Sequence, residues 1–584
     1  MKPLICRRTV PSTHRFSAAV PPLLQRLYAA RDLLQEDAIS LEFKALYPPQ
    51  LLHGIEAAVA LLVTQLQRQG RVLIVSDFDA DGATSCALAI RALRAMGFAH
   101  VDYIVPNRFE YGYGLTPEIV ALAKTRLPDL LMTVDNGISS VDGVAAAQAL
   151  GMQVLITDHH LPGRELPLAE AIVNPNQQAC AFPSKALAGV GVVFYLMAAL
   201  RSHLREQQWF VTQGISEPNL ANYLDIVALG TVADVVPLDR NNRILVSEGI
   251  KRIRAGRVCA GIAALLRLGK RDPATLIASD LGFAVAPRLN AAGRLDDMSL
   301  GIECLLTDDP SAAMAMAMEL DSMNQQRKLI ESDMRDQALE NLAAMQFDNE
   351  TLPAGLCIYQ DSWHQGVIGI LAARIKERLH RPVIAFADAG VDDTGLAQLK
   401  GSARSIAGLH IRDVLDTVAT RHPGLISRFG GHAMAAGLSL PKHAYGQFAT
   451  AFAAAVAEQL SEDELQARIV TDGELSPAQM SLDVAHLLRE AGPWGQHFPE
   501  PSFDGEFQIV QQNLLKGGHL KLVLSSPAQP QWVVDGIAFN VDVAQWEGER
   551  EYAGRVKLVY RLAINEFRGQ RSLQLLIEHI ERCV

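Results

Sequence analysis

The chain has 584 residues, of which 49% are hydrophobic and 20% are charged. This length corresponds to about four domains of roughly 150 residues, and the apolar content excludes a mainly disordered chain. Because 53 Lys and Arg stand against 64 Asp and Glu, the formal net charge is −11, so a polyanion must be bound by a local basic surface or by metal ions.

The cysteines and the apolar stretches indicate the compartment. The seven cysteines are widely spaced and include no C-x-x-C pair, which argues against a disulfide framework and against a zinc site. The apolar stretch Ala186–Leu200 is shorter than the ~20 residues that span a bilayer. The segment Met1–Phe16 lacks the apolar core of a signal peptide. We therefore expect a cytoplasmic protein that does not enter a membrane.

The predicted elements begin after an N-terminal stretch of about 50 residues that shows no strong periodicity. Apolar runs of strand length then alternate with segments of helical spacing. Such alternation predicts an α/β domain with a parallel sheet covered by helices on both faces. The predicted strands are Arg71–Ser76, Val101–Val105, Leu130–Val134 and Val154–Thr157, and the predicted helices are Thr84–Met96, Pro117–Arg126 and Ser140–Leu150.

The second half of the chain changes character twice. A glycine-free segment rich in Ala, Met and Leu predicts a long helix over Ser311–Met345, with Pro310 near its first turn. A second α/β segment follows, with strands at Leu356–Tyr359 and Pro382–Phe386. From about Leu465 onward, short alternating runs predict a small β-barrel or sandwich.

Three carboxylates follow the first predicted strand directly. Asp77, Asp79 and Asp81 alternate along the chain, so an extended backbone places them on one face. Their mutual repulsion calls for a hard divalent cation such as Mg²⁺ or Mn²⁺. An EF-hand loop is an alternative, but Leu88 stands at its twelfth position. An aspartyl-phosphatase pattern is another, but Ala83 stands where that pattern has a hydroxyl, and a solvated acidic turn is the third alternative.

Three further segments carry acids or histidines after apolar runs. Asp135 follows the strand Leu130–Val134, and Asp158, His159 and His160 follow the strand Val154–Thr157. Asp234 lies inside an apolar run, where an unpaired carboxylate is costly. Each segment alone has an ordinary structural explanation. Together they converge on the edge where open α/β sheets bind ligands, which predicts a site for two divalent ions about 4 Å apart.

The same segments carry a resemblance to a known family. The motifs DFDADGATS, VDNGISS, TDHH and GTVADVVPL occur in this order, followed by PRLNAAGR, SWHQGVIGILAARI, KGSARS and FGGHAMAAG. This set resembles the DHH phosphoesterase superfamily and, within it, the bacterial single-strand-specific DNA exonucleases. The resemblance runs from about residue 50 to the C-terminus. It implies an N-terminal extension (1–50), a DHH domain (51–305), a long connecting helix (306–348), a DHHA1 domain (349–462) and an oligonucleotide-binding (OB) barrel (463–584).

The resemblance also implies roles for individual residues. Asp158 and His160 occupy catalytic positions: Asp158 orients its histidine neighbours, and His160 contacts the phosphate or assists the leaving group. Val75 stands where other branches of the superfamily have a histidine. The implied metal ligands are Asp77, Asp79, Asp81, Asp135, His159 and Asp234. The implied substrate-binding residues are Arg288, Asn290, His364, Ser402, Arg404, Gly430, Gly431 and His432.

The implied function is a single-stranded-DNA-specific 5′-to-3′ exonuclease in DNA repair and recombination. It uses two Mn²⁺ or Mg²⁺ ions to hydrolyse phosphodiester bonds and releases mononucleotides. The implied partners are single-stranded DNA, single-strand-binding protein and a DNA helicase. One alternative is a phosphodiesterase for short oligonucleotides or cyclic dinucleotides, whose known members are shorter. Another is a non-catalytic single-stranded-DNA-binding scaffold, which loss of the acids and histidines would mark.

Overall fold

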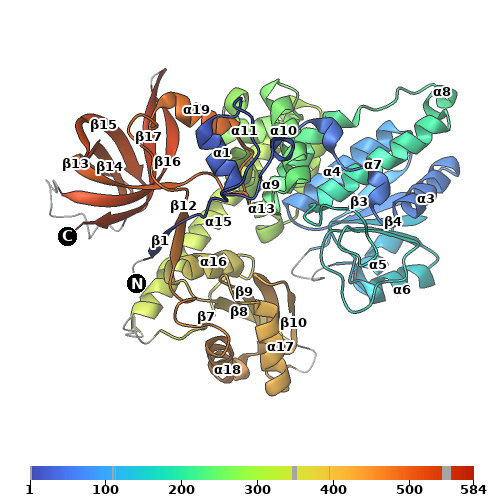
Figure 1. Ribbon diagram of the computed structural model, residues 1–584. Helices are drawn as coiled ribbons and strands as arrows, with labels where there is room; N and C mark the ends of the chain where they lie inside the picture. The colour runs from blue at the N-terminus through green and yellow to red at the C-terminus, as the bar shows by residue number, and fades with distance from the viewer. Residues whose placement is uncertain are drawn as a thin grey trace. The chain divides into compact units, whose positions relative to one another are not determined.

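The computed structural model describes residues 3–107, 111, 114–344, 352–392, 395–541, 554–567 and 569–583. The chain divides into two compact units (Figure 1). The large unit combines residues 7–321 with 470–584, and the small unit combines residues 322–469 with those up to Cys6. The five-part division expected from the sequence stays a prediction.

A parallel five-stranded sheet organises the first half of the large unit, in the order β3-β2-β4-β5-β6. Every residue of β2 and β4 is buried, as their unbroken apolar sequences predict. Helices α5 (Pro117–Lys124) and α6 (Val141–Ala149) cover one face, and α4 (Ala80–Ala95) and α7 (Gly189–Glu206) cover the other (Figure 1). The strands are β2 (Val72–Ser76), β3 (Val101–Ile104), β4 (Leu130–Val134), β5 (Gln153–Thr157) and β6 (Ala171–Val173). The predicted α/β fold is confirmed.

The central strands of this sheet end in register. Ser76 pairs with Val134, Val134 pairs with Thr157, and Thr157 pairs with Val173. The residues that follow β2, β4 and β5 therefore leave the sheet at one edge. This register brings together motifs that lie about 60 and 80 residues apart in the sequence.

Helices complete the first half of the large unit. Further helices there are α1 (Pro22–Ala29), α3 (Ile55–Gln67), α9 (Leu224–Ala233), α10 (Arg240–Arg254), α11 (Ala260–Leu268), α13 (Ala286–Leu295) and α14 (Ser299–Leu306). No single helix among the described residues has the length and apolarity of a membrane span, although one bent pair, Phe43–Leu51 with Ile55–Gln67, meets those criteria by length and composition alone.

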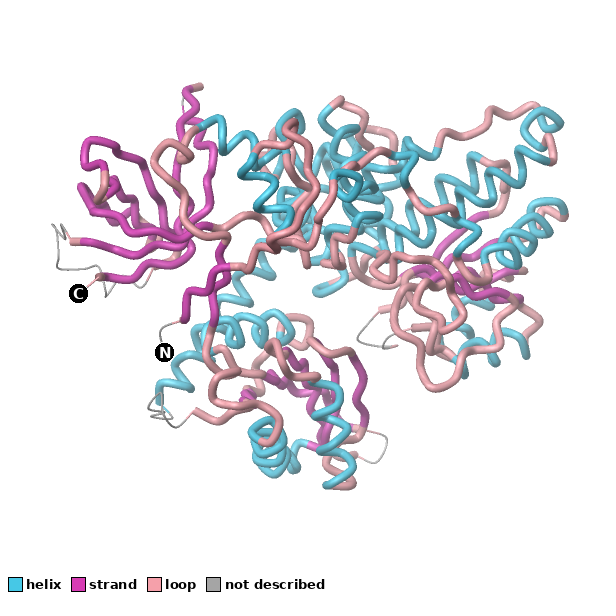
Figure 2. Tube along the Cα trace, viewed as in Figure 1, coloured by secondary structure: helices cyan, strands magenta, loops and turns pink. Residues whose placement is uncertain are grey.

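A closed five-stranded barrel forms the C-terminal part of the large unit, in the order β13-β14-β15-β17-β16. Its strands are the magenta group beside the C-terminus in Figure 2. Antiparallel pairs build most of it, and the parallel pairing of β15 with β17 completes the closure. Phe503 and Tyr560 are fully buried in this part of the chain, with ring centroids 6.1 Å apart. The strands are β13 (Phe503–Leu515), β14 (His519–Ser526), β15 (Gln529–Ala538), β16 (Arg555–Phe567) and β17 (Gln570–Arg582). The predicted barrel is confirmed.

The N-terminal segment packs against the chain that enters the barrel. Just after α1, the guanidinium of Arg31 donates to both carboxylate oxygens of Asp472, at 2.9 and 2.8 Å, and to the carbonyl of Pro499. The Arg31 and Asp472 side chains are only 1% and 2% exposed. Tyr28 stacks on Trp494 and Phe498 beside this pair. The segment thus helps to hold the barrel within the large unit.

The small unit is built around a mixed five-stranded sheet. The long helix α15 (Pro310–Ala344) leads into it, close to the predicted bounds, although Met345 lies outside the described residues. The sheet order is β10-β11-β9-β8-β7, with β7 parallel to β8 and the other pairs antiparallel. Its elements are β7 (Leu356–Tyr359), α16 (Ile368–Leu379), β8 (Val383–Val391), β9 (Ala397–Arg404), α17 (Ile411–Arg421), β10 (Arg428–Gly431), β11 (Ala435–Pro441) and α18 (Tyr445–Ala457).

Candidate metal centre

The predicted metal ligands, together with His160, which was predicted as a catalytic residue, lie at the carboxyl edge of the parallel sheet. Their ligand atoms form three overlapping groups, each with all atoms within 4.8 Å of one another. Asp135 belongs to two of these groups and His159 to two, so the groups are parts of one centre. The groups are Asp135, His159 and His160; Asp81, His159 and Asp234; and Asp77, Asp79 and Asp135.

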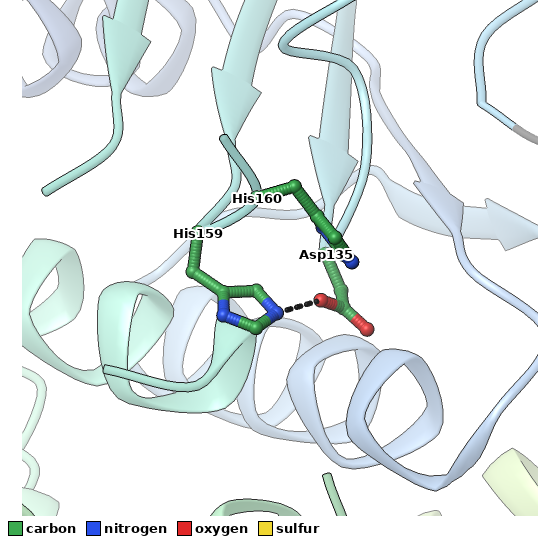
Figure 3. Close-up of side chains that lie close together, drawn as sticks. All are labelled: Asp135, His159 and His160. Carbon is green, nitrogen blue, oxygen red and sulfur yellow. Dashed lines mark ion pairs between the residues drawn. The ribbon is translucent and has the colours of Figure 1, made fainter. Parts of the chain in front are cut away.

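His159 lies at the middle of the centre. Its Nε2 atom is 3.1 Å from Asp135 Oδ1, 3.4 Å from Asp234 Oδ2 and 3.9 Å from Asp81 Oδ2. Figure 3 shows the His159 ring pointing at the Asp135 carboxylate, with His160 beside it. The Nε2 atom of His159 and the Oδ2 atom of Asp234 are buried and make no hydrogen bond among the described residues. Buried ligand atoms of this kind fit hard divalent cations.

The pKa values of three carboxyl groups in the centre are raised, because their charged forms are buried close together without a cation. Burial, together with the charge of Asp234, raises the pKa of Asp81 to about 7. Burial, together with the charge of Asp79, raises the pKa of Asp234 to about 8. The pKa of Asp135 is also raised, by burial first and then by the neighbouring carboxylates. Burial lowers the pKa of His159, which favours the neutral imidazole that binds metals.

The N-terminus of α7 holds Asp81. The backbone N–H of Gly189 donates to Asp81 Oδ2 at 2.6 Å, and the N–H of Val190 donates to Asp81 Oδ1 at 3.0 Å. A Cβ atom on Gly189 would lie 2.7 Å from both Cβ and Oδ1 of Asp135. A glycine is therefore required here, because α7 and the Asp135 side chain come closer than a methyl group allows. The sequence carries no signal for this contact between Gly189 and Asp135.

Asn136 joins the ends of two strands. Its Nδ2 donates to the carbonyl of Val75 at 3.1 Å and to that of Val134 at 3.0 Å. Thr133 in turn donates its hydroxyl to the Asn136 carbonyl at 2.7 Å. These bonds fix a turn in which Asp135 has a φ of +62°, a left-handed conformation that costs free energy in a residue with a side chain. Asn136 and Thr133 were missed because D-N-G is also an ordinary turn sequence.

Asp158 organises both histidines. Its Oδ1 accepts from the backbone N–H groups of His159 and His160 and lies 2.8 Å from His160 Nδ1, while its Oδ2 accepts from Ile138 N at 2.9 Å. Burial lowers the pKa of His160, but the hydrogen bond and charge of Asp158 outweigh that effect and raise it to about 9. Asn176 and Asn174 donate to the carbonyls of His159 and His160. The two histidines are thus held by side chain and backbone alike.

Two of the predicted substrate-binding residues lie on α13, in the same unit as the centre. Arg288 donates its Nε to Asp321 at 2.7 Å and an Nη to the Ala284 carbonyl. Asn290 accepts a hydrogen bond from Ala80 N through Oδ1 at 2.8 Å. Asn290 therefore contacts the first residue of α4, which lies between Asp79 and Asp81.

The other predicted substrate-binding residues lie in the small unit. Arg404 donates to Ser402 Oγ at 3.0 Å. A Cβ atom on Gly369, in the first turn of α16, would lie 2.8 Å from the Arg404 guanidinium and 2.9 Å from Ser402 Oγ. His364 lies before that helix and accepts from Gly366 N at 3.1 Å. Gly430, Gly431 and His432 lie in and just after β10. A guanidinium, a hydroxyl and a helix N-terminus meeting at one place are suited to a phosphate.

Family models match three segments of this chain, and related proteins match it over nearly its whole length. The model of the DHH family, N-terminal domain, matches residues 71–231; the DHHA1 domain matches 352–462; and the RecJ OB domain matches 471–579. The chain is 55% identical over 576 residues to the single-stranded-DNA-specific exonuclease RecJ of Escherichia coli, covering 98% of both chains. It is 31% identical to the protein of the same name from Thermus thermophilus, covering 95% of this chain and 79% of that one.

Two solved RecJ structures also match almost the whole of this chain. The crystal structure of RecJ in complex with Mn²⁺ from Thermus thermophilus superposes with a TM-score of 0.77 at 28% identity, covering 97% of this chain and 76% of that chain. The complex of that RecJ with Mg²⁺ superposes with a TM-score of 0.73 at 27% identity, with coverage of 97% and 75%.

Proposed function

The chain belongs to the RecJ family of single-stranded-DNA-specific exonucleases, and we propose that it hydrolyses single-stranded DNA with two Mn²⁺ or Mg²⁺ ions, releasing mononucleotides. The observation that carries the proposal is the buried centre in which His159 meets three carboxylates within 3.9 Å. The Mn²⁺ and Mg²⁺ complexes of the matching structures support the choice of ions. A role in DNA repair and recombination accompanies that activity.

Each residue of the centre has a definite part in this proposal. Divalent ions bound here supply Lewis-acid activation of water and of the scissile phosphate. The hydrogen bond and charge of Asp158 raise the pKa of His160, which favours a ring that donates to a phosphate oxygen or to the leaving oxygen. Asp158 keeps that ring in place through its 2.8 Å contact with Nδ1. The proposed ion ligands are Asp77, Asp79, Asp81, Asp135, His159 and Asp234.

The proposed substrate contacts are those expected from the sequence, and Gly369 is added as a residue that makes room for them. Ser402 and Arg404 grip a phosphate beside the N-terminus of α16, and Gly369 allows the close approach that this grip needs. The further proposed contacts are Arg288, Asn290, His364, Gly430, Gly431 and His432. The proposed direction is 5′ to 3′. Single-strand-binding protein and a DNA helicase are proposed partners, and the cytoplasm is the proposed location.

The experiment that tests this function uses a long 5′-labelled single strand and its duplex. Digestion is followed with Mn²⁺, with Mg²⁺ and with EDTA, for the wild type and for Asp135→Ala. Asp142→Ala is the matched control, because Asp142 is an exposed carboxylate on α6. We expect metal-dependent release of mononucleotides from the single strand only, unchanged in the control and at least ~10³-fold slower in Asp135→Ala, as for removal of an essential catalytic group.

The other outcomes separate the alternative functions. Cleavage confined to oligonucleotides of a few residues or to cyclic dinucleotides would favour the short-substrate phosphodiesterase. Tight binding of the single strand without cleavage under every metal condition would favour the non-catalytic scaffold. Either result would overturn the exonuclease proposal. A strand labelled at the 3′ end tests the direction separately, because 5′-to-3′ digestion releases the 3′ label last.

A further inference from the structure

One face of α13 lies against the turn from β2 into α4, which carries Asp77 and Asp79 and leads to Asp81 in the first turn of the helix. Asn290 Oδ1 accepts from the N–H of Ala80 at 2.8 Å. Three residues later, a Cβ atom on Gly293 would lie 1.8 Å from the carbonyl oxygen of Phe78. Positions three apart share one side of a helix. The loop Phe78–Ala80 therefore rests on that side of α13.

The hydrogen bond from Ala80 to Asn290 completes the N-terminal cap of α4. A helix begins with N–H groups that have no partner within the helix. Asp79 Oδ1 accepts from Asp81 N at 2.8 Å and from Gly82 N at 3.0 Å, and Ala83 N bonds the Asp79 carbonyl. The remaining N–H group, that of Ala80, is the one bound by Asn290. Without Asn290, the buried N–H of Ala80, which lies between Asp79 and Asp81, loses its acceptor, and the first turn of α4 loses a contact that fixes it.

The same loop is confined sterically between two glycines. A Cβ atom on Gly82 would lie 2.4 Å from the Asp77 carbonyl oxygen, and one on Gly293 would lie 1.8 Å from the Phe78 carbonyl oxygen. Both obstructing atoms belong to the backbone, so no side-chain rotation relieves the overlap. A methyl group on Gly293 must therefore displace either α13 or the loop itself.

We propose that Asn290 and Gly293 are positioning residues of the metal centre, which act by fixing the turn from β2 into α4, so that Asp79 at the N-cap and Asp81 in the first turn of the helix are presented to the ions. The inference rests on the proposed function only in that divalent ions bind at this centre. The PRLNAAGR segment would then orient metal ligands through Asn290 and Gly293, in addition to the phosphate contact expected of Arg288.

The test measures Mn²⁺ binding without DNA by titration calorimetry. Loss of groups that orient metal ligands costs about 10- to 100-fold in affinity, so we expect the Mn²⁺ Kd to rise at least 10-fold in Asn290→Ala and in Gly293→Ala. Asn290→Asp keeps an acceptor oxygen for Ala80, and we expect it to bind Mn²⁺ within about 3-fold of the wild type. Gly301→Ala is the matched control on α14, because its Cβ would meet only side-chain atoms of Met298 and Leu289.

Asn290→Asp also distinguishes positioning from substrate contact. If Asn290 acts only by contacting DNA, the Ala and Asp variants both bind Mn²⁺ like the wild type and raise KM for the single strand. That result would overturn the inference. Asn290→Ser, which is too short to reach Ala80, replaces Asn290→Ala if the latter does not fold, as judged by circular dichroism. If the wild type itself does not bind Mn²⁺, that result would instead contradict the proposed function.

Discussion

The close approach of Gly189 to Asp135 predicts a large effect of one methyl group. In Gly189→Ala the new Cβ would lie 2.7 Å from Asp135 Cβ and Oδ1, whereas ordinary contacts begin near 3.4 Å, so one group must move by about 0.7 Å. Asp135 is 1% exposed and cannot swing into solvent. Misplacement of about 1 Å at an active site costs on the order of 100-fold in rate. We therefore expect kcat for single-strand digestion to fall about 100-fold, or ~2.7 kcal/mol in the barrier.

The assay is steady-state digestion of a long single strand at saturating Mn²⁺, which separates kcat from KM. Gly191→Ala is the matched control, because it lies in the same first turn of α7 and the nearest atoms to its Cβ would be those of the flexible Leu187 side chain. Alanine is favoured over glycine in a helix by about 1 kcal/mol, so both variants should fold. If Gly189→Ala digests DNA within about 3-fold of Gly191→Ala, the contact does not position Asp135 and the reasoning is wrong.

Three further predictions concern stability and substrate binding. Asp81 and Asp234 have pKa values raised to about 7 and 8, so the free energy of unfolding of the metal-free protein should fall as the pH rises from about 4 to about 8. The expected loss is about 1.4 kcal/mol for each pH unit by which folding raises a pKa. Urea midpoints in EDTA at about pH 5 and pH 8 test this, and an unchanged midpoint contradicts it. Arg31→Ala leaves the buried Asp472 carboxylate without its cation and should destabilise the large unit by about 3–5 kcal/mol; a urea midpoint equal to that of the wild type refutes this. Arg404→Gln should raise KM for the single strand about 10-fold with little change in Mn²⁺ affinity, and a changed Mn²⁺ affinity with unchanged KM would be the opposite result.

The position of the centre could be predicted from the sequence because the side chains concerned follow buried strands. Parallel strands share one carboxyl edge, so the apolar runs before Asp77, Asp135 and Asp158 are sufficient to place these residues together. The long helix and the barrel could be predicted for a similar reason, since local periodicity and alternation determine them. In each case the signal lies within one contiguous segment.

The groups that hold the ligands could not be predicted in the same way. The N–H of Gly189 contacts Asp81 across 108 residues, and Asn290 contacts Ala80 across 210. A single backbone hydrogen bond between distant segments leaves no periodic pattern in either of them. The pair of Arg31 and Asp472, 441 residues apart, likewise lies in segments without strong periodicity. These contacts depend on tertiary packing, which composition and spacing do not encode.

Occupancy of the centre by manganese is the decisive measurement for this protein. We would soak crystals of the protein in Mn²⁺ and record an anomalous difference map at the manganese edge. We expect two peaks at the carboxyl edge of the parallel sheet, bounded by Asp79, Asp81, Asp135, His159 and Asp234, and loss of the peak nearest residue 135 in Asp135→Ala. A map without peaks at this edge, or with manganese bound only elsewhere on the chain, would contradict the proposed two-ion centre.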